Sequence, residues 1–179
     1  MDDIQTMFQI DYFQFDVSGW EGKKKKLLDL MNKRKLDFFG GHNHTSYASN
    51  IEDTDLSNQV KTILADELTK IQSILGFEDY SINYSWFQEE LKGMFHHLHN
   101  HGSENKLSCV CYIEYDEKYH NPITFVCPYP GLFDGVTQYT QPVNVKSGTI
   151  IFFPSVINHF TIPNETNIPR KILSFNIKA

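Results

Sequence analysis

The chain has 179 residues, which suits one domain with a sizeable core and is short for two. Hydrophobic residues make up 40% and charged residues 21%, a composition typical of globular proteins and not of disordered ones. The formal net charge of −6 argues against nucleic acid and anionic membranes as partners. No stretch approaches the roughly 20 apolar residues of a membrane span, and the acidic start lacks signal-peptide character. We therefore expect a single cytoplasmic domain over residues 1–179.

The first half of the sequence predicts one strand and two helices. The stretch MFQIDYFQFDV, residues 7–17, has the apolar and aromatic content of a strand. A helix is expected from about Ser18 to Leu36, because Ser18 and Glu21 have the spacing of a capping box. The run Lys23–Lys26 on this helix is interpreted as a solvated face in preference to a binding patch.

A loop is expected over residues 38–50, and the second helix follows it. Apolar residues recur there at helical spacing, and Gly76 stands where a C-terminal cap is expected. The apolar positions are Val60, Ile63, Leu64, Leu68, Ile71, Ile74 and Leu75.

After Gly76 the sequence changes to short β-rich runs separated by proline, glycine and asparagine. This spacing predicts a sandwich or barrel of antiparallel strands, with the helices packed against one sheet. The expected strands cover residues 80–88, 107–115, 123–128, 142–146, 149–154, 158–162 and 170–178.

The three cysteines, Cys109, Cys111 and Cys127, cannot form a fully paired set of disulfides. Cys109 and Cys111 alternate within one predicted strand, where we expect them to pack as small apolar side chains. The cysteines therefore fit a reducing compartment.

Four of the eight histidines lie within MFHHLHNH, residues 94–101. On an extended strand His97, His99 and His101 would share one face, and His96 would point the other way. Either adjacent pair of the three could chelate one ion, so this pattern alone leaves both pairs open. A third ligand must then come from elsewhere in the chain.

His159 is the best candidate for the third ligand. Two ligands on one strand and a distant histidine on a later strand form the arrangement of barrel-type mononuclear iron sites. Arg170 follows His159 across the turn-rich stretch IPNETNIP. If residues 163–169 reverse the chain, Arg170 lies on the strand beside the one that carries His159.

The second half carries a series of motifs in a fixed order: Trp86, Gly93, His99 with His101, LSCVCY (107–112), Gly148, FPS (153–155), His159, PN (163–164), Arg170 and SFN (174–176). In this order and spacing the sequence resembles the 2-oxoglutarate/Fe(II)-dependent oxygenase superfamily, and closely a small bacterial and phage-type branch of it. The first half resembles that branch more loosely.

The resemblance implies roles for individual residues. Its metal-binding pair follows the motif glycine by six and eight positions, which from Gly93 gives His99 and His101. These two and His159 would be the metal ligands and the catalytic residues. Arg170 would bind the distal carboxylate of 2-oxoglutarate, a role that suits a planar guanidinium. Tyr112 would donate a hydrogen bond to the same cosubstrate.

The resemblance also implies a fold and an activity. The fold would be mainly β, a double-stranded β-helix (jelly-roll, cupin-like) core over residues 80–179, with a helical support region over residues 1–79. The activity would couple oxidative decarboxylation of 2-oxoglutarate by Fe(II) and O2 to C–H hydroxylation of a small-molecule or peptide substrate. The resemblance also allows a homodimer formed through the N-terminal elements.

One residue departs from the superfamily at large. His101 stands where most members have aspartate or glutamate, so the site is one charge more positive, which dianionic 2-oxoglutarate would offset. Three histidines also suit zinc, nickel or copper. The alternatives are therefore a non-catalytic, cupin-like Zn/Ni-binding module, and an inactive homologue that binds a partner. A halogenase is disfavoured, because His101 would fill the position that chloride needs.

The remaining candidates have simpler interpretations. His42 and His44 form a second H-x-H within a glycine-rich stretch, which we interpret as a surface loop or lid and not as a metal site. His120 is expected in a turn, and His96 and His97 as packing or surface residues beside the metal pair. The large aromatic residues Trp86, Phe152 and Phe153 are expected in the core, with Trp86 also a candidate for the pocket wall.

Overall fold

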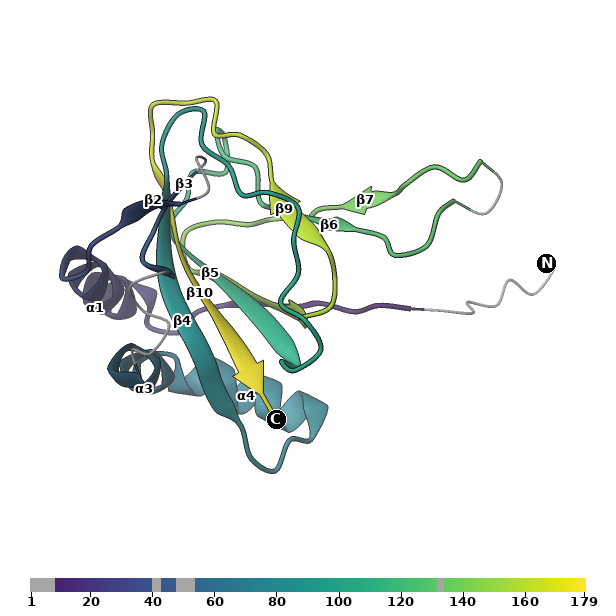
Figure 1. Ribbon diagram of the computed structural model, residues 1–179. Helices are drawn as coiled ribbons and strands as arrows, with labels where there is room; N and C mark the ends of the chain where they lie inside the picture. Colours follow the sequence, from purple (N-terminus) through teal and green to yellow (C-terminus); the bar gives the residue numbers. More distant parts are fainter. Residues whose placement is uncertain (1–8, 40–42, 48–53, 132–133) are drawn as a thin grey trace.

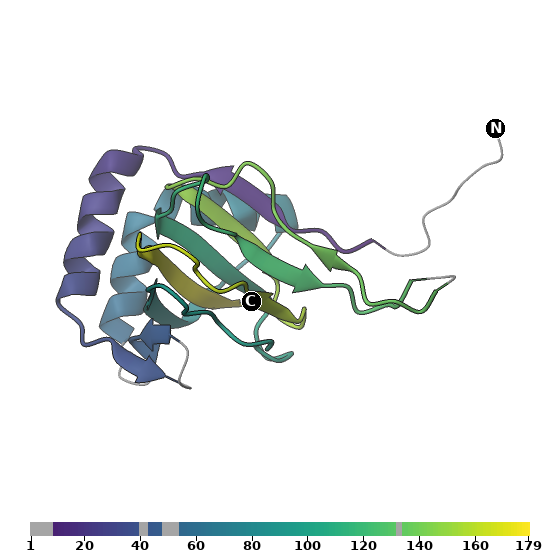
Figure 2. The ribbon, with the colours of Figure 1, turned by 90° about the horizontal axis from the view of Figure 1, so that it is seen from above.

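The computed structural model describes residues 9–39, 43–47, 54–131 and 134–179. Within these residues ten strands form two antiparallel sheets that face each other. Three helices of the described ranges cover the outer face of the larger sheet (Figures 1 and 2). None of the described helices is both long and apolar enough to cross a membrane.

The larger sheet holds seven strands and the smaller sheet holds three. In spatial order the larger sheet runs β1 (Phe13–Asp16), β8 (Thr149–Pro154), β5 (Leu107–Glu114), β10 (Arg170–Lys178), β4 (Ser81–Glu90), β3 (Asn43–Thr45) and β2 (Asp37–Phe39). The smaller sheet runs β7 (Tyr139–Thr140), β6 (Ile123–Val126) and β9 (His159–Thr161). The helices are α1 (Trp20–Asn32), α3 (Thr54–Ile63) and α4 (Ala65–Leu75). The mainly β, jelly-roll fold with helices on one sheet is confirmed.

Alternate residues of the central strands face two separate cores. On β5, Cys109 and Cys111 contribute to the core under the helices, and Val110 contributes to the core between the sheets. On β8, Phe152 belongs to the first core and Phe153 to the second. Because successive side chains of a strand point to opposite faces, such apolar runs mark strands covered on both sides. Cys109 and Cys111 thus pack as small apolar side chains, as expected, and the three cysteines are free.

The predicted capping box at the first helix is wrong. Gly19, in a left-handed conformation, precedes the helix, which runs from Trp20 to Asn32 without a side-chain cap. The Ser18 hydroxyl donates to Asp66 at the start of α4, and the Ser18 N–H donates to Glu67. The tertiary contact with α4 therefore uses the side chain that the sequence offers as a local cap.

The lysine run on α1 is partly solvated. Lys25 and Lys26 are exposed, as expected for a solvated face. Lys23 instead pairs with Asp66 at 3.0 Å and with Glu67 at 2.9 Å. The run therefore contributes to the contact between α1 and α4 through its first member.

The expected second helix is two helices, since Leu64 interrupts it between α3 and α4. Leu64 is fully buried, and Val60 on one side and Leu68 on the other belong to the same core. The interruption lets both helices bury their apolar side chains against one twisted sheet. Gly76 ends α4 at φ 70°, which confirms its predicted cap.

Two other segments differ from the prediction. The expected loop 38–50 contributes β2 and β3, which extend the sheet beyond β4. The expected strand 142–146 has no strand pairing: Pro142 has no N–H to offer, and Asn144 adopts φ 56°. In the segment of β2 and β3, pairing with β4 overrides a composition typical of loops.

Gly148 precedes β8 at φ +91°, and a Cβ built there would lie 2.8 Å from the ring of Trp20. We expect Gly148→Ala to destabilise the fold by about 2–4 kcal/mol, because left-handed backbone and overpacking each cost about 1–3 kcal/mol. Gly22 lies inside α1 with open space around it. Gly22→Ala is the matched control and is expected to stabilise the fold by about 0.5–1 kcal/mol. Urea midpoints check both, and equal midpoints would contradict the expectation.

Candidate metal and cosubstrate site

Three histidines converge at a cavity between the two sheets. The ring nitrogens that His99, His101 and His159 offer lie within 4.8 Å of one another. Among the described residues, these three histidines form the group whose ligand atoms could hold a metal ion. Small rotations of the rings would bring all three nitrogens within coordination distance of one ion.

Backbone hydrogen bonds and ring hydrogen bonds fix two of these rings. His99 and His159 exchange backbone N–H···O bonds of 3.0 and 2.9 Å in an isolated bridge. Nδ1 of His99 bonds the His97 carbonyl at 2.6 Å, and Nδ1 of His159 bonds the Ile157 carbonyl at 2.9 Å. A neutral imidazole that donates from Nδ1 leaves Nε2 as a lone-pair ligand, so both rings are prepared for a metal. The histidine segment forms this bridge inside a loop, so its prediction as a strand is wrong.

His101 is held by the other sequence motifs. Its N–H donates to the Ser155 carbonyl at 2.9 Å, and its carbonyl accepts from the Asn105 amide at 3.1 Å. The Ser108 hydroxyl in turn bonds Ser155 and Asn176 inside the sheet. The motifs LSCVCY, FPS and SFN thus form a buried polar support behind the triad.

Burial sets the protonation of the triad. It lowers the pKa of His101 to about 4, and lowers the pKa values of His99 and His159 below the usual range. The neighbouring imidazoles act in the same direction on His101 and His159. All three rings are therefore neutral at neutral pH, which is the form that binds a metal.

Arg170 lies in the same cavity as the triad, at the start of β10. Burial lowers its pKa to about 10, so the guanidinium stays charged at neutral pH. It donates to the Glu90 carboxylate and to the Asn121 carbonyl. Two of its five N–H donors are used in these bonds, so donors remain for a second carboxylate.

Tyr112 also lines this cavity and is buried. Its oxygen accepts the Ile123 N–H at 2.9 Å, and burial raises its pKa. The phenol therefore keeps its proton and can donate it. Arg170 and Tyr112 together suit a ligand that carries carboxylate groups, which fits 2-oxoglutarate.

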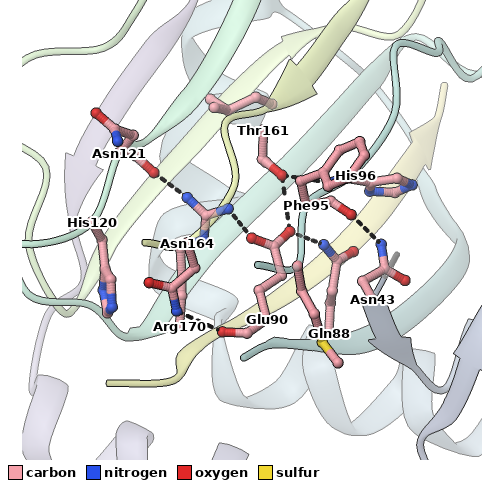
Figure 3. A network of polar contacts seen from close by, with 12 residues as sticks. Asn43, Gln88, Glu90, Phe95, His96, His120, Asn121, Thr161, Asn164 and Arg170 are labelled. Carbon is pink, nitrogen blue, oxygen red and sulfur yellow. Dashed lines mark hydrogen bonds and ion pairs between the residues drawn. The ribbon is translucent and has the colours of Figure 1, made fainter. Parts of the chain in front are cut away.

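Sequence reasoning missed the acidic partner of the arginine. Glu90 is 1% exposed and accepts from Gln88 at 2.6 Å and from Thr161 at 2.9 Å, besides Arg170 (Figure 3). The Thr161 hydroxyl oxygen also accepts the His96 N–H at 2.7 Å, so the network reaches the histidine segment. A signal for Glu90 was present in the two-residue period of β4, which puts it on the cavity face with Trp86.

The asparagine of the PN motif joins three segments around this network. The Asn164 amide donates to the Glu90 carbonyl at 2.9 Å and to the Ile168 carbonyl at 2.8 Å. Its backbone carbonyl accepts the Gly93 N–H at 2.7 Å. Asn164 thus fixes the turn that reverses the chain between His159 and Arg170.

The remaining histidines lie apart from the triad or beside it. His44 is on β3, 4.0 Å from Glu89, and His42 lies outside the described residues. His120 is buried at the end of a turn, where it accepts the Asp116 N–H at 3.0 Å. The His96 ring stacks on His99 with 4.1 Å between centroids.

The predictions for the three large aromatic residues are confirmed. Phe152 and Phe153 are buried in the two cores. Trp86 is 4% exposed and also lines the cavity, with its ring centroid 5.5 Å from that of His101. Trp86 therefore has both of the roles considered for it.

Comparison with known proteins agrees with this site. The family model described as 2OG-Fe(II) oxygenase matches residues 84–176, the segment that contains the triad and Arg170. No curated protein sequence is similar enough to count as a match.

Solved structures of similar fold cover nearly the whole chain at low identity. HygX from Streptomyces hygroscopicus, with nickel, 2-oxoglutarate and hygromycin B bound, has a TM-score of 0.70 at 10% identity over 94% of this chain and 83% of its own. The viral collagen prolyl hydroxylase from Paramecium Bursaria Chlorella virus-1 has a TM-score of 0.61 at 15% identity, over 94% of this chain and 95% of its own. The epimerase SnoN from nogalamycin biosynthesis has a TM-score of 0.72 at 13% identity, over 94% of this chain and 78% of its own. With the family match over more than half of its length, the chain belongs to the 2OG-Fe(II) oxygenase family and is a 2-oxoglutarate- and Fe(II)-dependent oxygenase.

Proposed function

We propose that His99, His101 and His159 hold the Fe(II), and that the enzyme hydroxylates a C–H bond of its substrate. The observation that supports this is the convergence of three neutral imidazoles in a cavity that also contains a buried, charged arginine. When bound, Fe(II) and 2-oxoglutarate supply the oxidising chemistry. The chain contributes the ligand set, the binding of the cosubstrate and the exclusion of water.

The cosubstrate is oriented by two side chains. Arg170 binds the distal carboxylate through the N–H donors that Glu90 and Asn121 leave available. Tyr112 donates its hydroxyl proton to a cosubstrate oxygen while it accepts the Ile123 N–H. Because both side chains are buried, little water competes for these bonds.

The substrate is proposed to be a small molecule or a peptide. Similar folds are seen in HygX with hygromycin B bound and in a collagen prolyl hydroxylase, one of each kind. The negative net charge argues against nucleic acid. The free cysteines are consistent with a reducing compartment, so we place the enzyme in the cytoplasm. The homodimer stays a prediction.

The function is tested by loading the protein with Fe(II) and 2-oxoglutarate without oxygen and then admitting oxygen. We expect a weak visible charge-transfer band before oxygen is added and release of succinate afterwards. The absence of both signals in iron-loaded, folded protein would contradict the proposal.

Arg170→Lys is expected to weaken 2-oxoglutarate binding at least about tenfold, because lysine keeps the charge and loses the bidentate fork. The matched control is Lys171→Gln, at the next position of β10, where the side chain pairs with Glu114 at 2.8 Å. Titration calorimetry with Ni(II)-loaded protein measures both variants. Equal affinities of the two variants for 2-oxoglutarate would show that Arg170 does not bind the cosubstrate.

The alternative that the sequence left open, a cupin-like module that binds Zn(II) or Ni(II) without catalysis, makes a different prediction for the same variant. The all-histidine ligand set supports it, because these ions also favour imidazole. In that case Arg170→Lys leaves the metal affinity unchanged, and 2-oxoglutarate has no effect on the thermal stability of the metal-loaded protein.

A further inference from the structure

A second cavity lies beside the triad. Its volume is about 300 Å³, at the lower end of the range for small-molecule sites. His99 and His101 line this cavity as well as the one that contains Arg170. Its other wall comes from β2 and β3, the segment expected to be a loop, through Phe39 and Asn43.

Aromatic rings form one side of this second cavity. The Tyr47 ring lies 6.1 Å from Phe39 and 5.3 Å from Trp86, and Trp86 lies 5.5 Å from His101, all between centroids. The row of rings therefore leads from Phe39, which is 47% exposed, to a ring of the triad. A flat or cyclic apolar group can pack along it.

Asn43 offers the hydrogen-bonding group that stands out in this cavity. The residue is 2% exposed, and its side-chain oxygen has no hydrogen-bond partner within the described parts of the chain. Its amide nitrogen donates to the Phe95 carbonyl at 3.4 Å, which leaves the oxygen pointing away from that bond (Figure 3). A buried acceptor without a partner is costly, so a donor from a ligand would be favourable.

Two other polar side chains of the wall, those of Thr45 and Asn100, already have partners. The Thr45 hydroxyl donates to the Phe87 carbonyl and accepts the Tyr47 N–H. The Asn100 amide donates to Asn158 and accepts the Gly102 N–H. Asn43 Oδ1 is therefore a buried acceptor of this wall for which the described residues supply no partner.

Among the described residues, the lining of the cavity contains no aspartate, glutamate, lysine or arginine. An ionised group that entered would lose its hydration without gaining an opposite charge from these side chains. The cavity therefore selects against carboxylates, phosphates and ammonium groups.

We propose that this cavity binds the substrate through an uncharged ring that carries an N–H or O–H donor. The ring packs against Tyr47 and Trp86, and the donor bonds Asn43 Oδ1. The assignment as a substrate site rests on the proposed oxygenase function at the triad, whereas the binding preference itself does not.

Three probes of one shape test the proposal: benzamide, benzoate and benzamidine. They share a ring and differ in charge and in the donors that they present. Binding is followed by tryptophan fluorescence on the full chain kept metal-free with a chelator, so that benzoate has no metal to coordinate. We expect benzamide to bind at least about tenfold more tightly than either charged probe.

Two variants of Asn43 sharpen the test. Asn43→Leu removes the acceptor and is expected to weaken the binding of benzamide about tenfold. Asn43→Asp supplies a negative charge and is expected to change the preference to benzamidine. Asn58→Asp, the same change at an exposed position of α3, is the control and should leave the order of the three probes unaltered.

Equal binding of the three probes, or an unchanged order in folded Asn43→Leu and Asn43→Asp proteins, overturns the proposal. A urea midpoint shows whether each variant is folded. Because metal is absent from these titrations, a protein that binds benzamide but releases no succinate would refute the oxygenase function alone. A protein that turns over but shows no preference would refute the cavity assignment alone.

Discussion

His159→Ala is expected to weaken the binding of Ni(II) or Co(II) by more than about 100-fold and to abolish succinate release. Loss of a partner behind a metal ligand already costs about 10- to 100-fold in affinity, and a lost ligand costs more. Two neutral imidazoles remain in this variant, and His99 also loses the ring that lies 4.2 Å from its own. The Co(II) visible spectrum and competition with a chromogenic chelator measure the loss.

The matched control is His44→Ala. His44 belongs to the other H-x-H pair, and its neighbour is Glu89 on β4 and not the triad. We expect this variant to keep one tightly bound metal ion and full turnover. Metal binding that survived in His159→Ala, or that disappeared in His44→Ala, would move the metal site away from the cavity between the sheets.

Glu90→Gln is expected to destabilise the metal-free protein by about 3–5 kcal/mol, the cost of leaving a buried charge without its partner. The side chains of Glu90 and Arg170 are 1% and 3% exposed, so solvent screens the unpaired guanidinium very little. The conservative change keeps the volume of the side chain and removes its charge. Urea unfolding measures the difference from wild type.

The control for this change is Glu89→Gln at the adjacent position. Glu89 is 23% exposed and lies 3.8 Å from Lys171, so we expect a change within about 0.5 kcal/mol in the free energy of unfolding.

In Glu90→Gln, bound 2-oxoglutarate supplies a carboxylate to Arg170 in place of the one removed, so the thermal shift that it causes should exceed that of wild type. A thermal shift no larger than that of wild type would argue against cosubstrate binding by Arg170.

The sequence was sufficient to predict that His99, His101 and His159 come together, but not how the strands around them pair. The expectation that Arg170 lies on the strand beside that of His159 is wrong, because β9 pairs with β6 in the smaller sheet and β10 lies in the larger sheet. His99, His101, His159 and Arg170 could be found because each lies in a short motif with fixed spacing. The apolar runs of β5, β8 and β10 have the two-residue period that assigns each side chain to one of two cores. These features depend on local sequence, so local sequence predicts them.

What could not be predicted depends on contacts between distant segments. Asn43 lies in a stretch rich in glycine, asparagine and histidine, and its strand exists because β4 offers an unpaired edge. Ser18 has the spacing of a helix cap, but the carboxylates of α4 bind it more favourably. The two-residue period of β4 puts Glu90 on the cavity face, but its pairing with Arg170 follows only from the sheet register.

The position of Glu90 also has a consequence for the charge of the whole cavity. In a site with two histidines and one carboxylate, a divalent ion, that carboxylate, an arginine and a dianion sum to zero. Here the proposed ligand set is neutral, yet the acid beside Arg170 supplies the missing negative charge, so the sum is again zero. The centre can thus be electrically neutral although its carboxylate lies beside the guanidinium and not on the metal ion. A net charge in the low-dielectric interior is avoided in this way.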